Sequence, residues 1–213
     1  MEETGFTMKD GRQWFIDGWQ LFKRKPLLLI SGTVLWVVLE VMLALVPVVG
    51  EIIDGLLFPF LYGGFLYGIR QVDRQQSLEL KHFFQGYFDK AKIRPLLILG
   101  LLLVFFEIIE AGLIVIIGPF AALVLAAPLG ILVFSALLYS VPLVMFGDIE
   151  TIGAIKSSYD SCGKHISALI SIYLIMLGFA LLAIVTMGFG LLLIMPVTFC
   201  AFYLSYKAIY GDV

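Results

Sequence analysis

The placement of the basic residues constrains the fold of this chain more than any other feature. All fourteen Lys and Arg residues fall in four clusters, at residues 9–25, 70–94 and 156–164 and at Lys207. The three stretches between the clusters are mostly apolar, and each is long enough for two membrane crossings of about 20 residues. Because Lys and Arg stay on the cytoplasmic side of a bilayer, each stretch is expected to cross and return. The pattern predicts three hairpins, and hence six transmembrane helices with both termini in the cytoplasm.

The composition agrees with this prediction. Hydrophobic residues make up 61% of the 213 residues and charged residues 14%, compared with about 45–50% and about 25% in soluble domains. We therefore expect an all-α integral membrane protein with a single membrane domain over residues 1–213. Its six helices are predicted at residues 27–46, 50–69, 96–117, 120–146, 166–187 and 190–209.

Two further features bear on processing and on cysteine chemistry. The apolar run after Lys25 is too long for the core of a cleavable signal peptide and lacks a small-x-small cleavage site, so we expect it to be retained as the first helix. Cys162 and Cys200 are expected to be unpaired, and neither has a spacing typical of metal ligands.

Several landmarks recur at nearly equal intervals along the chain. The three apolar stretches begin at Lys25-Pro26-Leu27, Arg94-Pro95-Leu96 and Lys164-His165-Ile166. The expected outer turns carry Gly50, Gly118 and Gly188. The second helix of each hairpin carries Pro59, Pro128 and Pro196. These intervals predict three parallel repeats, each an amphipathic helix followed by a hairpin, over residues 9–70, 77–146 and 148–210.

Each predicted repeat begins with an amphipathic segment. In the middle repeat, the residues with helical spacing are Leu80, Phe83, Phe84, Tyr87, Phe88 and Ala91. The stripe in the first repeat is Phe15, Gly18, Trp19 and Phe22, and in the third it is Ile152, Ile155, Tyr159 and Cys162. Ser77 and Asp148 are the expected N-caps of the second and third segments. Such helices are expected to lie in the membrane interface; the alternative is that they fold against the ends of the transmembrane helices.

The interfacial interpretation assigns lipid contacts to aromatic and basic side chains. They are Trp14, Trp19, Lys23, Arg24, Lys25, Phe83, Phe84, Tyr87, Phe88, Lys90, Lys92 and Arg94. In the second transmembrane helix, Gly64 and Gly68 form a GxxxG motif, which we expect to serve helix packing within the chain rather than contact with a second copy. Pro128 and Pro142 predict a kink or a break in the long fourth helix.

Five carboxylates interrupt the apolar stretches. Glu51 and Asp54 lie near an expected outer turn, where water and the start of a helix favour negative charge. Glu40, Glu107 and Glu110 lie deeper, where an ionised acid costs about 2.5–3.5 kcal/mol. Three interpretations remain open for the deeper acids: protonated hydrogen-bond donors between helices, a proton or cation transport site, or contacts to lipid headgroups.

Two stretches resemble a known family. Residues 18–30, GWQLFKRKPLLLI, resemble the start of a large family of uncharacterised bacterial six-helix membrane proteins. Residues 141–169, VPLVMFGDIETIGAIKSSYDSCGKHISAL, resemble a signature of the same group. Related sequences include YciC-like inner-membrane proteins and the membrane domain found with some glycerophosphoryl diester phosphodiesterases. The resemblance implies a multi-pass protein of the bacterial inner membrane with no established activity, and it carries over no functional residues.

Two functional hypotheses follow. The first is a non-catalytic membrane module that engages anionic lipids, a membrane-protein partner or a second copy of the chain. The second is a proton-coupled, ion or small-solute transporter that uses Glu40, Glu107 and Glu110 in a water-accessible cavity between the first and third transmembrane helices. Enzyme motifs are missing, so we expect no catalytic residues, metal, cofactor or nucleic-acid partner. His82 and His165 are expected at the interfacial surface.

Overall fold

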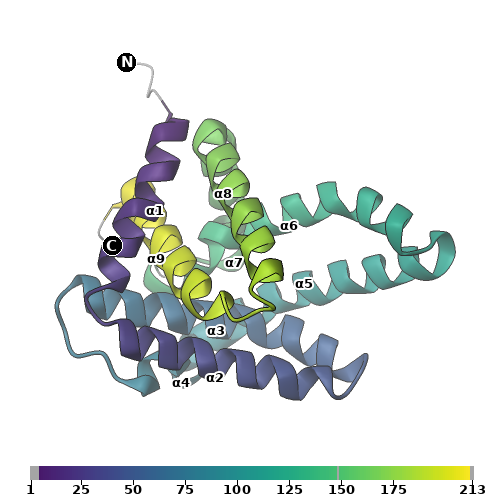
Figure 1. Ribbon diagram of the computed structural model, residues 1–213, viewed down its shortest axis with the longest axis horizontal. Helices are drawn as coiled ribbons and strands as arrows, with labels where there is room; N and C mark the ends of the chain where they lie inside the picture. The colour runs from purple at the N-terminus through teal and green to yellow at the C-terminus, as the bar shows by residue number, and fades with distance from the viewer. Residues whose placement is uncertain (1–4, 148, 212–213) are drawn as a thin grey trace. The chain divides into compact units, whose positions relative to one another are not determined.

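The structure is a computed structural model that describes residues 5–147 and 149–211, and in these residues it is entirely helical (Figure 1). The order of elements is a short helix followed by two long helices, three times over. The first group is α1 (Met8–Phe22), α2 (Pro26–Ala44) and α3 (Val49–Asp73). The second is a 3₁₀ helix, η1 (Leu80–Phe84), with α4 (Gln85–Phe88), α5 (Lys90–Ile117) and α6 (Pro119–Gly147). The third is α7 (Thr151–Lys164), α8 (Ile166–Val185) and α9 (Leu191–Tyr210).

The predicted six long apolar helices are confirmed. The structure has six helices, α2, α3, α5, α6, α8 and α9, that are long and apolar enough to span a membrane, which identifies a multi-pass membrane protein. Two ends differ from the prediction, because α3 continues to Asp73 and α5 begins at Lys90. The predicted N-cap Asp148 lies outside the described residues.

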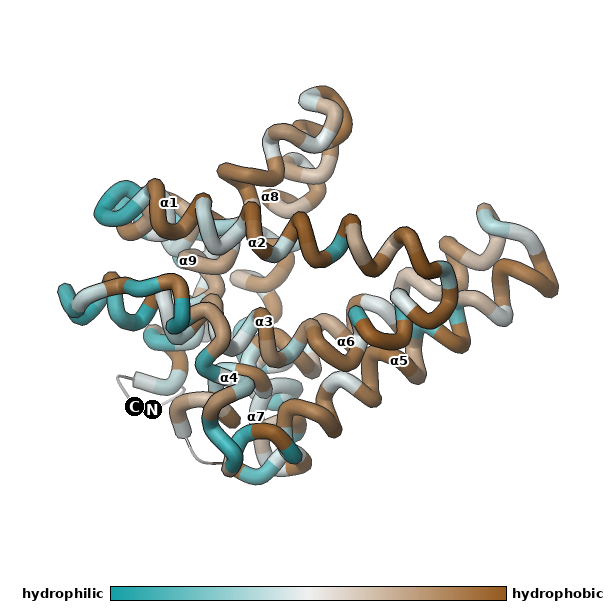
Figure 2. Tube along the Cα trace, turned by 90° about the horizontal axis from the view of Figure 1, so that it is seen from below, coloured by the Kyte–Doolittle hydropathy of each residue, from teal (hydrophilic) through white to brown (hydrophobic). Residues whose placement is uncertain are grey.

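Apolar side chains cover much of the surface of these helices. Val115, Phe120 and Met187 are 85%, 81% and 88% exposed, which is compatible with lipid and not with water. Figure 2 shows hydrophobic residues running along α2, α5 and α6. In each hairpin the second helix is the more buried one. In the most apolar 18 residues of each helix, 61% are buried in α3 against 22% in α2, 39% in α6 against 11% in α5, and 56% in α9 against 22% in α8. The first helix of each pair therefore presents most of its surface to lipid.

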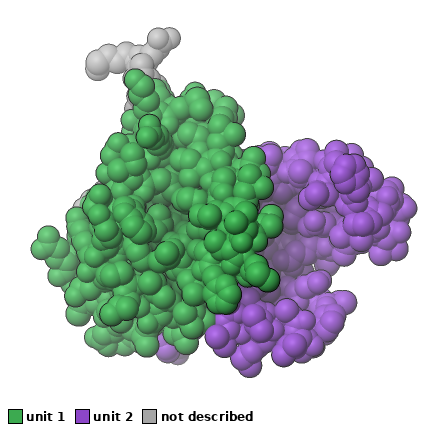
Figure 3. Space-filling model, in the orientation of Figure 1, with its two compact units in different colours: residues 1–36, 65–83, 160–213 green, residues 37–64, 84–159 purple. Residues whose placement is uncertain are grey.

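The chain divides into two compact units (Figure 3). One unit comprises residues 1–36, 65–83 and 160–213, and the other comprises residues 37–64 and 84–159. We call them unit 1 and unit 2. Helices α1, α8 and α9 belong to unit 1, and α4, α5 and α6 belong to unit 2, whereas α2, α3 and α7 contribute residues to both.

The outer turns depend on backbone conformations that glycine adopts readily. Gly118 and Gly188 have φ angles of 82° and 88°, as the prediction of turn glycines requires. Gly50 differs, because it lies within the first turn of α3 and the preceding Val48 has the positive φ, at 66°. At Gly50 a Cβ would collide with the backbone of Leu43, so the residue is small because the turn is tight.

The predicted amphipathic helix over residues 80–91 is interrupted. Asp89 has an extended conformation, and its Oδ1 accepts a hydrogen bond from the Ala91 N–H at 3.0 Å, so that it caps α5. An aspartate prefers this position to a helix interior, because its side chain satisfies a free N–H group. The expected cap Ser77 is not at a helix start, since η1 begins at Leu80.

Within unit 1, the apolar face of α1 packs on α8 and α9. A Cβ at Gly11 would lie 2.5 Å from the carbonyl oxygen of Ala168, and one at Gly18 would lie 2.9 Å from the nitrogen of Ala201. Glycine at both positions lets the helix backbones approach closely, as small residues do between membrane helices. The first amphipathic helix is therefore folded against the bundle, which was the alternative to an interfacial position.

Within unit 2, α6 is continuous through both prolines, so the predicted break does not occur. Pro142 has no N–H to donate to the carbonyl of Leu138, four residues earlier. The hydroxyl of Tyr62 donates to that carbonyl instead, at 3.2 Å. One turn earlier, the hydroxyl of Ser158 accepts from the Tyr139 N–H at 3.2 Å and donates to the Ser135 carbonyl at 2.6 Å. The side chain of Ser158 thus hydrogen-bonds both the N–H and the carbonyl group that face each other across this turn of α6.

This packing displaces α7 from its predicted face. The buried residues of α7 include Ala154 and Ser158, whereas Ile152 and Tyr159 of the predicted stripe are exposed and only Cys162 of that stripe is buried. Helix α7 can come close to α6 only if the side chains between them are small. The hydroxyl of Ser158 reaches the α6 backbone because the two helices are this close.

We expect Tyr62→Phe to destabilise the protein by about 1–3 kcal/mol, because it leaves the buried Leu138 carbonyl without a donor. In a Pro142→Ala background the restored N–H can donate to that carbonyl, so the same change should cost less. The free energy of unfolding in detergent, measured as a double-mutant cycle, checks this coupling. Tyr67→Phe, whose hydroxyl makes no described hydrogen bond, serves as the control. Equal costs of Tyr62→Phe in both backgrounds would contradict the assignment.

Candidate functional site

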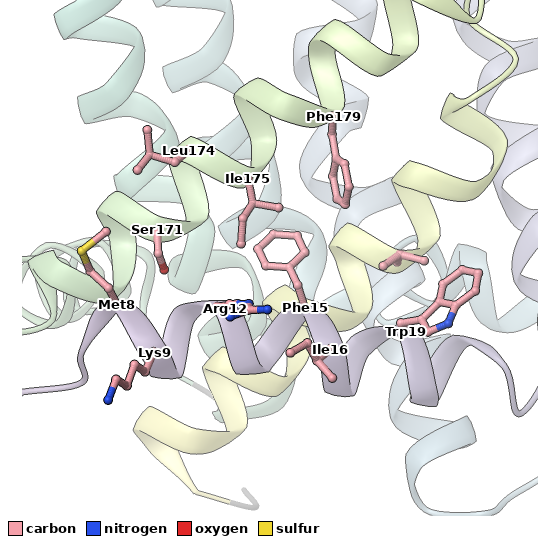
Figure 4. A pocket seen from close by; sticks show the side chains of 11 residues that line it. Met8, Lys9, Arg12, Phe15, Ile16, Trp19, Ser171, Leu174, Ile175 and Phe179 are labelled. Atoms are coloured by element: carbon pink, nitrogen blue, oxygen red, sulfur yellow. The ribbon is translucent and has the colours of Figure 1, made fainter.

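A groove of about 750 Å³ lies in unit 1, between α1 and α8 (Figure 4). Its lining residues are Met8, Lys9, Arg12, Phe15, Ile16, Trp19, Ser171, Leu174, Ile175, Phe179 and Val197. Figure 4 shows Ile175 and Phe179 descending from α8 towards Phe15. The rings of Phe15 and Phe179 meet edge to face with centroids 5.7 Å apart. The groove is therefore apolar along its length.

The charged groups of the groove lie at its α1 side. Lys9 and Arg12 are one helical turn apart and both are exposed. The remaining polar lining residue, Ser171, donates its hydroxyl hydrogen to the Ala168 carbonyl at 2.7 Å. The groove thus combines an apolar channel with two cations at one edge.

The start of α1 is held by two local devices. Asp10 Oδ2 accepts hydrogen bonds from the N–H and the hydroxyl of Thr7, both at 2.7 Å. Phe6 packs on Trp14 with ring centroids 5.3 Å apart, and its N–H donates to Nδ1 of His165 at 3.0 Å. His165 is half-buried and therefore positions the segment before α1, rather than lying on the predicted interfacial surface.

His82 makes a similar backbone contact. Its Nδ1 accepts from the Glu79 N–H at 3.1 Å, and its ring lies 5.7 Å from that of Tyr67. Both histidines of the chain therefore accept a backbone hydrogen bond through Nδ1.

The residues predicted to contact lipid fall into three groups: exposed, buried and half-buried. Those that are exposed and can contact headgroups are Trp19, Lys23, Arg24, Lys25, Phe88, Lys90 and Arg94. By contrast, Trp14, Phe83 and Lys92 are only 7%, 4% and 8% exposed, so the predicted headgroup contact is wrong for these three. The stripe pattern could not distinguish them, because a helix face looks the same in sequence whether lipid or protein covers it.

Phe83 shows what replaces the predicted contact. Within unit 1 its ring lies against Gly32 of α2 and Gly68 of α3, where added Cβ atoms would come within 2.8 Å and 3.0 Å of it. Gly68 of the predicted GxxxG motif therefore makes room for an aromatic ring of the same chain. Gly64 is buried, and its neighbour Gly63 packs on Met145 and Val141 of α6 in unit 2.

Phe84 and Tyr87 are half-buried. In unit 2 the ring of Tyr87 stacks on that of Phe60, with centroids 4.9 Å apart. Burial, together with the charge of Asp54, raises the pKa of Tyr87 to about 12. The phenol therefore stays neutral, and Tyr87 acts as a packing residue of unit 2.

The five acids form one group in unit 2. The side chain of Asp54 is hydrogen-bonded to that of Glu40, and Glu107 lies within electrostatic reach of both and of Glu51 and Glu110. Glu51 is exposed, as expected for the first turn of α3, whereas the other acids are half-buried. The side chains of Glu40 and Asp54 therefore lie next to each other within unit 2.

Glu107 lies in the packed contact between α3 and α5. A Cβ at Gly55 would be 2.8 Å from its Oε2, and one at Gly100 would be 2.8 Å from the Leu56 carbonyl oxygen, so the two helices are close here. Oε2 of Glu107 and Oδ1 of Asp54 are buried without a hydrogen-bond partner.

A cavity of about 270 Å³ in the same unit has no acid in its lining. Its residues are Ile53, Leu56, Leu57, Phe60, Tyr87, Ile93 and Leu97. The acids therefore lie at a packed contact between helices and not in the lining of this cavity, whereas the second hypothesis expects them in a water-accessible cavity. Among residues 5–147 and 149–211, no three His, Cys, Asp or Glu side chains are grouped so that they could hold a metal ion.

The groove itself was not predicted from the sequence. Its cations belong to the first basic cluster, but Lys9 and Arg12 were not singled out. Gly11 and Gly18 are seven residues apart, which places them on one helix face two turns apart. That spacing is the signal that could have indicated a packed rather than an interfacial α1.

No family model, curated protein or solved structure matches this chain. The fold and the groove define an all-helical, multi-pass membrane protein with a charged-edged apolar groove on its surface. Membership of the six-helix bacterial family stays a prediction from the two stretches that resemble it.

The hydrogen bonds from the N–H and hydroxyl of Thr7 hold the pKa of Asp10 below its ordinary value of 3.8. A lowered carboxyl pKa stabilises the fold above that ordinary value, and the stabilisation disappears as the pH falls through the lowered one. We expect Thr7→Val to raise the pKa of Asp10, because it removes the hydroxyl donor and keeps the N–H. Carboxyl ¹³C NMR titration measures the shift, and Thr7→Ser, which keeps a hydroxyl, should leave it unchanged. An unaltered pKa in Thr7→Val would contradict this contact.

Proposed function

We propose that this protein is a non-catalytic membrane module that binds an anionic lipid in the groove between α1 and α8. The observation that carries the proposal is the pairing of an apolar groove of about 750 Å³ with Lys9 and Arg12 at one edge. An amphiphile with a negative headgroup has the matching distribution of apolar and charged parts. Anionic lipid gains about 1 kcal/mol for each Lys or Arg near the membrane surface.

The packing of α1 supports the same proposal. Because Gly11 and Gly18 bring α1 against α8 and α9, the apolar wall and the cationic edge belong to helices fixed relative to one another within unit 1. Phe15 and Phe179 close the inner side of the groove, while Trp19 is 42% exposed at its edge. An indole at a membrane surface favours the headgroup region. We place the protein in a bacterial inner membrane, as the resemblance of residues 18–30 and 141–169 implies, and we place its termini in the cytoplasm, which the distribution of Lys and Arg supports.

We expect Lys9→Gln combined with Arg12→Gln to weaken retention of phosphatidylglycerol by about 2 kcal/mol, on the order of thirtyfold in affinity. Lys90→Gln combined with Arg94→Gln removes the same charge from the exposed start of α5 and is the matched control. Native mass spectrometry of the protein with bound lipid gives the retention of each variant.

A second variant separates the groove from general surface charge. Ile175→Trp fills the apolar channel without changing charge, and we expect it to displace the lipid as well. Equal retention in the wild type and in both groove variants would refute lipid binding at this site. Equal loss in the groove and control pairs would assign the lipid to surface charge alone.

A transporter is the second candidate, and the grouping of the five carboxylates in unit 2 favours it. In that case Glu40→Gln combined with Glu107→Gln should abolish proton flux into vesicles that contain the protein and a trapped pH dye. Glu51→Gln, which changes an exposed acid of the same group, should leave the flux intact. A wild-type flux no greater than that of empty vesicles, or a flux unchanged in the double variant, would exclude this candidate.

A further inference from the structure

A second cavity of unit 1, of about 300 Å³, has the opposite chemistry to the groove. It lies where the chain enters α2 and where α3 ends, and its lining residues are Arg24, Lys25, Val72, Gln75, Gln76 and Ser77. Five of these six side chains are polar: two cations, two amides and a hydroxyl. None of the six belongs to the groove proposed to bind lipid.

The end of α3 is shaped to bring the amides to this cavity. The Gln76 N–H donates to the Gln71 carbonyl at 2.8 Å and the Gln75 N–H to the Val72 carbonyl at 3.2 Å. With Gln75 at a φ of 56°, this is a Schellman motif. Its left-handed position is usually occupied by glycine, because a side chain there is strained. Glutamine at this position makes the backbone less stable than glycine would, and it adds an amide group to the lining of the cavity.

The nearby acid does not cancel the charge of the cavity. Asp73, which ends α3, accepts hydrogen bonds from Lys207 Nζ at 2.8 Å and from the Tyr203 hydroxyl at 3.1 Å. Arg24 approaches the same carboxylate only to 3.9 Å, and its side chain remains 51% exposed. Since Lys207 already neutralises Asp73, the charges of Arg24 and Lys25 are left to attract an anion.

We propose that this cavity binds a phosphate group, carried either by a lipid headgroup or by a free anion. The planar fork of an arginine matches phosphate oxygens, and lysine adds a point charge. The two amides and the hydroxyl of Ser77 supply further donors. A cavity of about 300 Å³ takes a group of headgroup size rather than a nucleotide.

The position along the chain agrees with a headgroup. Helix α2 begins at Pro26 and α3 ends at Asp73, so the cavity lies where two consecutive spans leave the apolar core on the same side. That is the depth of lipid phosphates. The site is separate from the α1–α8 groove, so its binding can persist if the lipid proposal fails.

The test uses the full chain in neutral detergent and two probes, inorganic phosphate and dihexanoyl phosphatidate, with dihexanoyl phosphatidylcholine as the lipid control. Isothermal titration calorimetry gives each affinity. We expect Arg24→Gln combined with Lys25→Gln to weaken binding by about tenfold or more, because hydrogen bonds to charged groups are lost. The matched pair Lys156→Gln and Lys164→Gln removes two exposed cations that line neither cavity of unit 1, and it should bind like the wild type.

Gln75→Gly separates binding from folding. Glycine suits the left-handed position, so the variant should melt at the same or a higher temperature while binding more weakly. Binding of both probes would support the site with the phosphate group alone sufficient, and binding of phosphatidate alone would support it with a lipid as the source. No saturable binding of either probe, or wild-type affinity in both the Arg24/Lys25 and the Gln75 variants, would overturn the proposal.

Discussion

Inside a bilayer every backbone polar group must find its partner within the protein, because the hydrocarbon supplies none. This constraint explains how α6 continues through Pro142. The missing N–H leaves the Leu138 carbonyl free, and the Tyr62 hydroxyl satisfies it from α3. The Ser158 hydroxyl also bonds the α6 backbone, accepting from the Tyr139 N–H and donating to the Ser135 carbonyl. Tyr62 and Pro142 of unit 2 therefore act as a coupled pair rather than as independent residues.

Close helix contacts then decide where small residues are required. Gly11 and Gly18 bring α1 to α8 and α9, and Gly55 and Gly100 bring α3 to α5. The first contact builds the groove, and the second encloses Glu107. The candidate site and the acid group thus both depend on close approach of helix backbones, which any residue larger than glycine would prevent at these positions.

The sequence predicts the six long helices because hydropathy and basic clusters are properties of neighbouring residues. The sequence does not reveal contacts between residues that lie far apart along the chain. The Tyr62 contact joins residues 76 apart, and the bond from Phe6 to His165 joins residues 159 apart. The predicted interfacial stripes contain residues that are now buried, such as Phe83, because lipid and protein cover an apolar face equally well. Glu40, Glu107 and Glu110 could be chosen from sequence, but the hydrogen bond of Glu40 to Asp54 could not. The threefold repeat stays a prediction, although the order of the elements agrees with it.

Helix α1 is far along the sequence from α8 and α9, on which it packs, and this separation has a consequence for biosynthesis. Helix α1 is translated first, whereas the residues that receive it, Ala168 and Ala201, follow only after four long helices have been made. At about 5–20 residues per second this interval lasts roughly 10–40 s. During that time the apolar face of α1 has no protein to cover it, and an amphipathic helix in this state lies flat on the membrane surface. We therefore expect α1 to occupy the membrane interface in the nascent chain, until the third hairpin has been made.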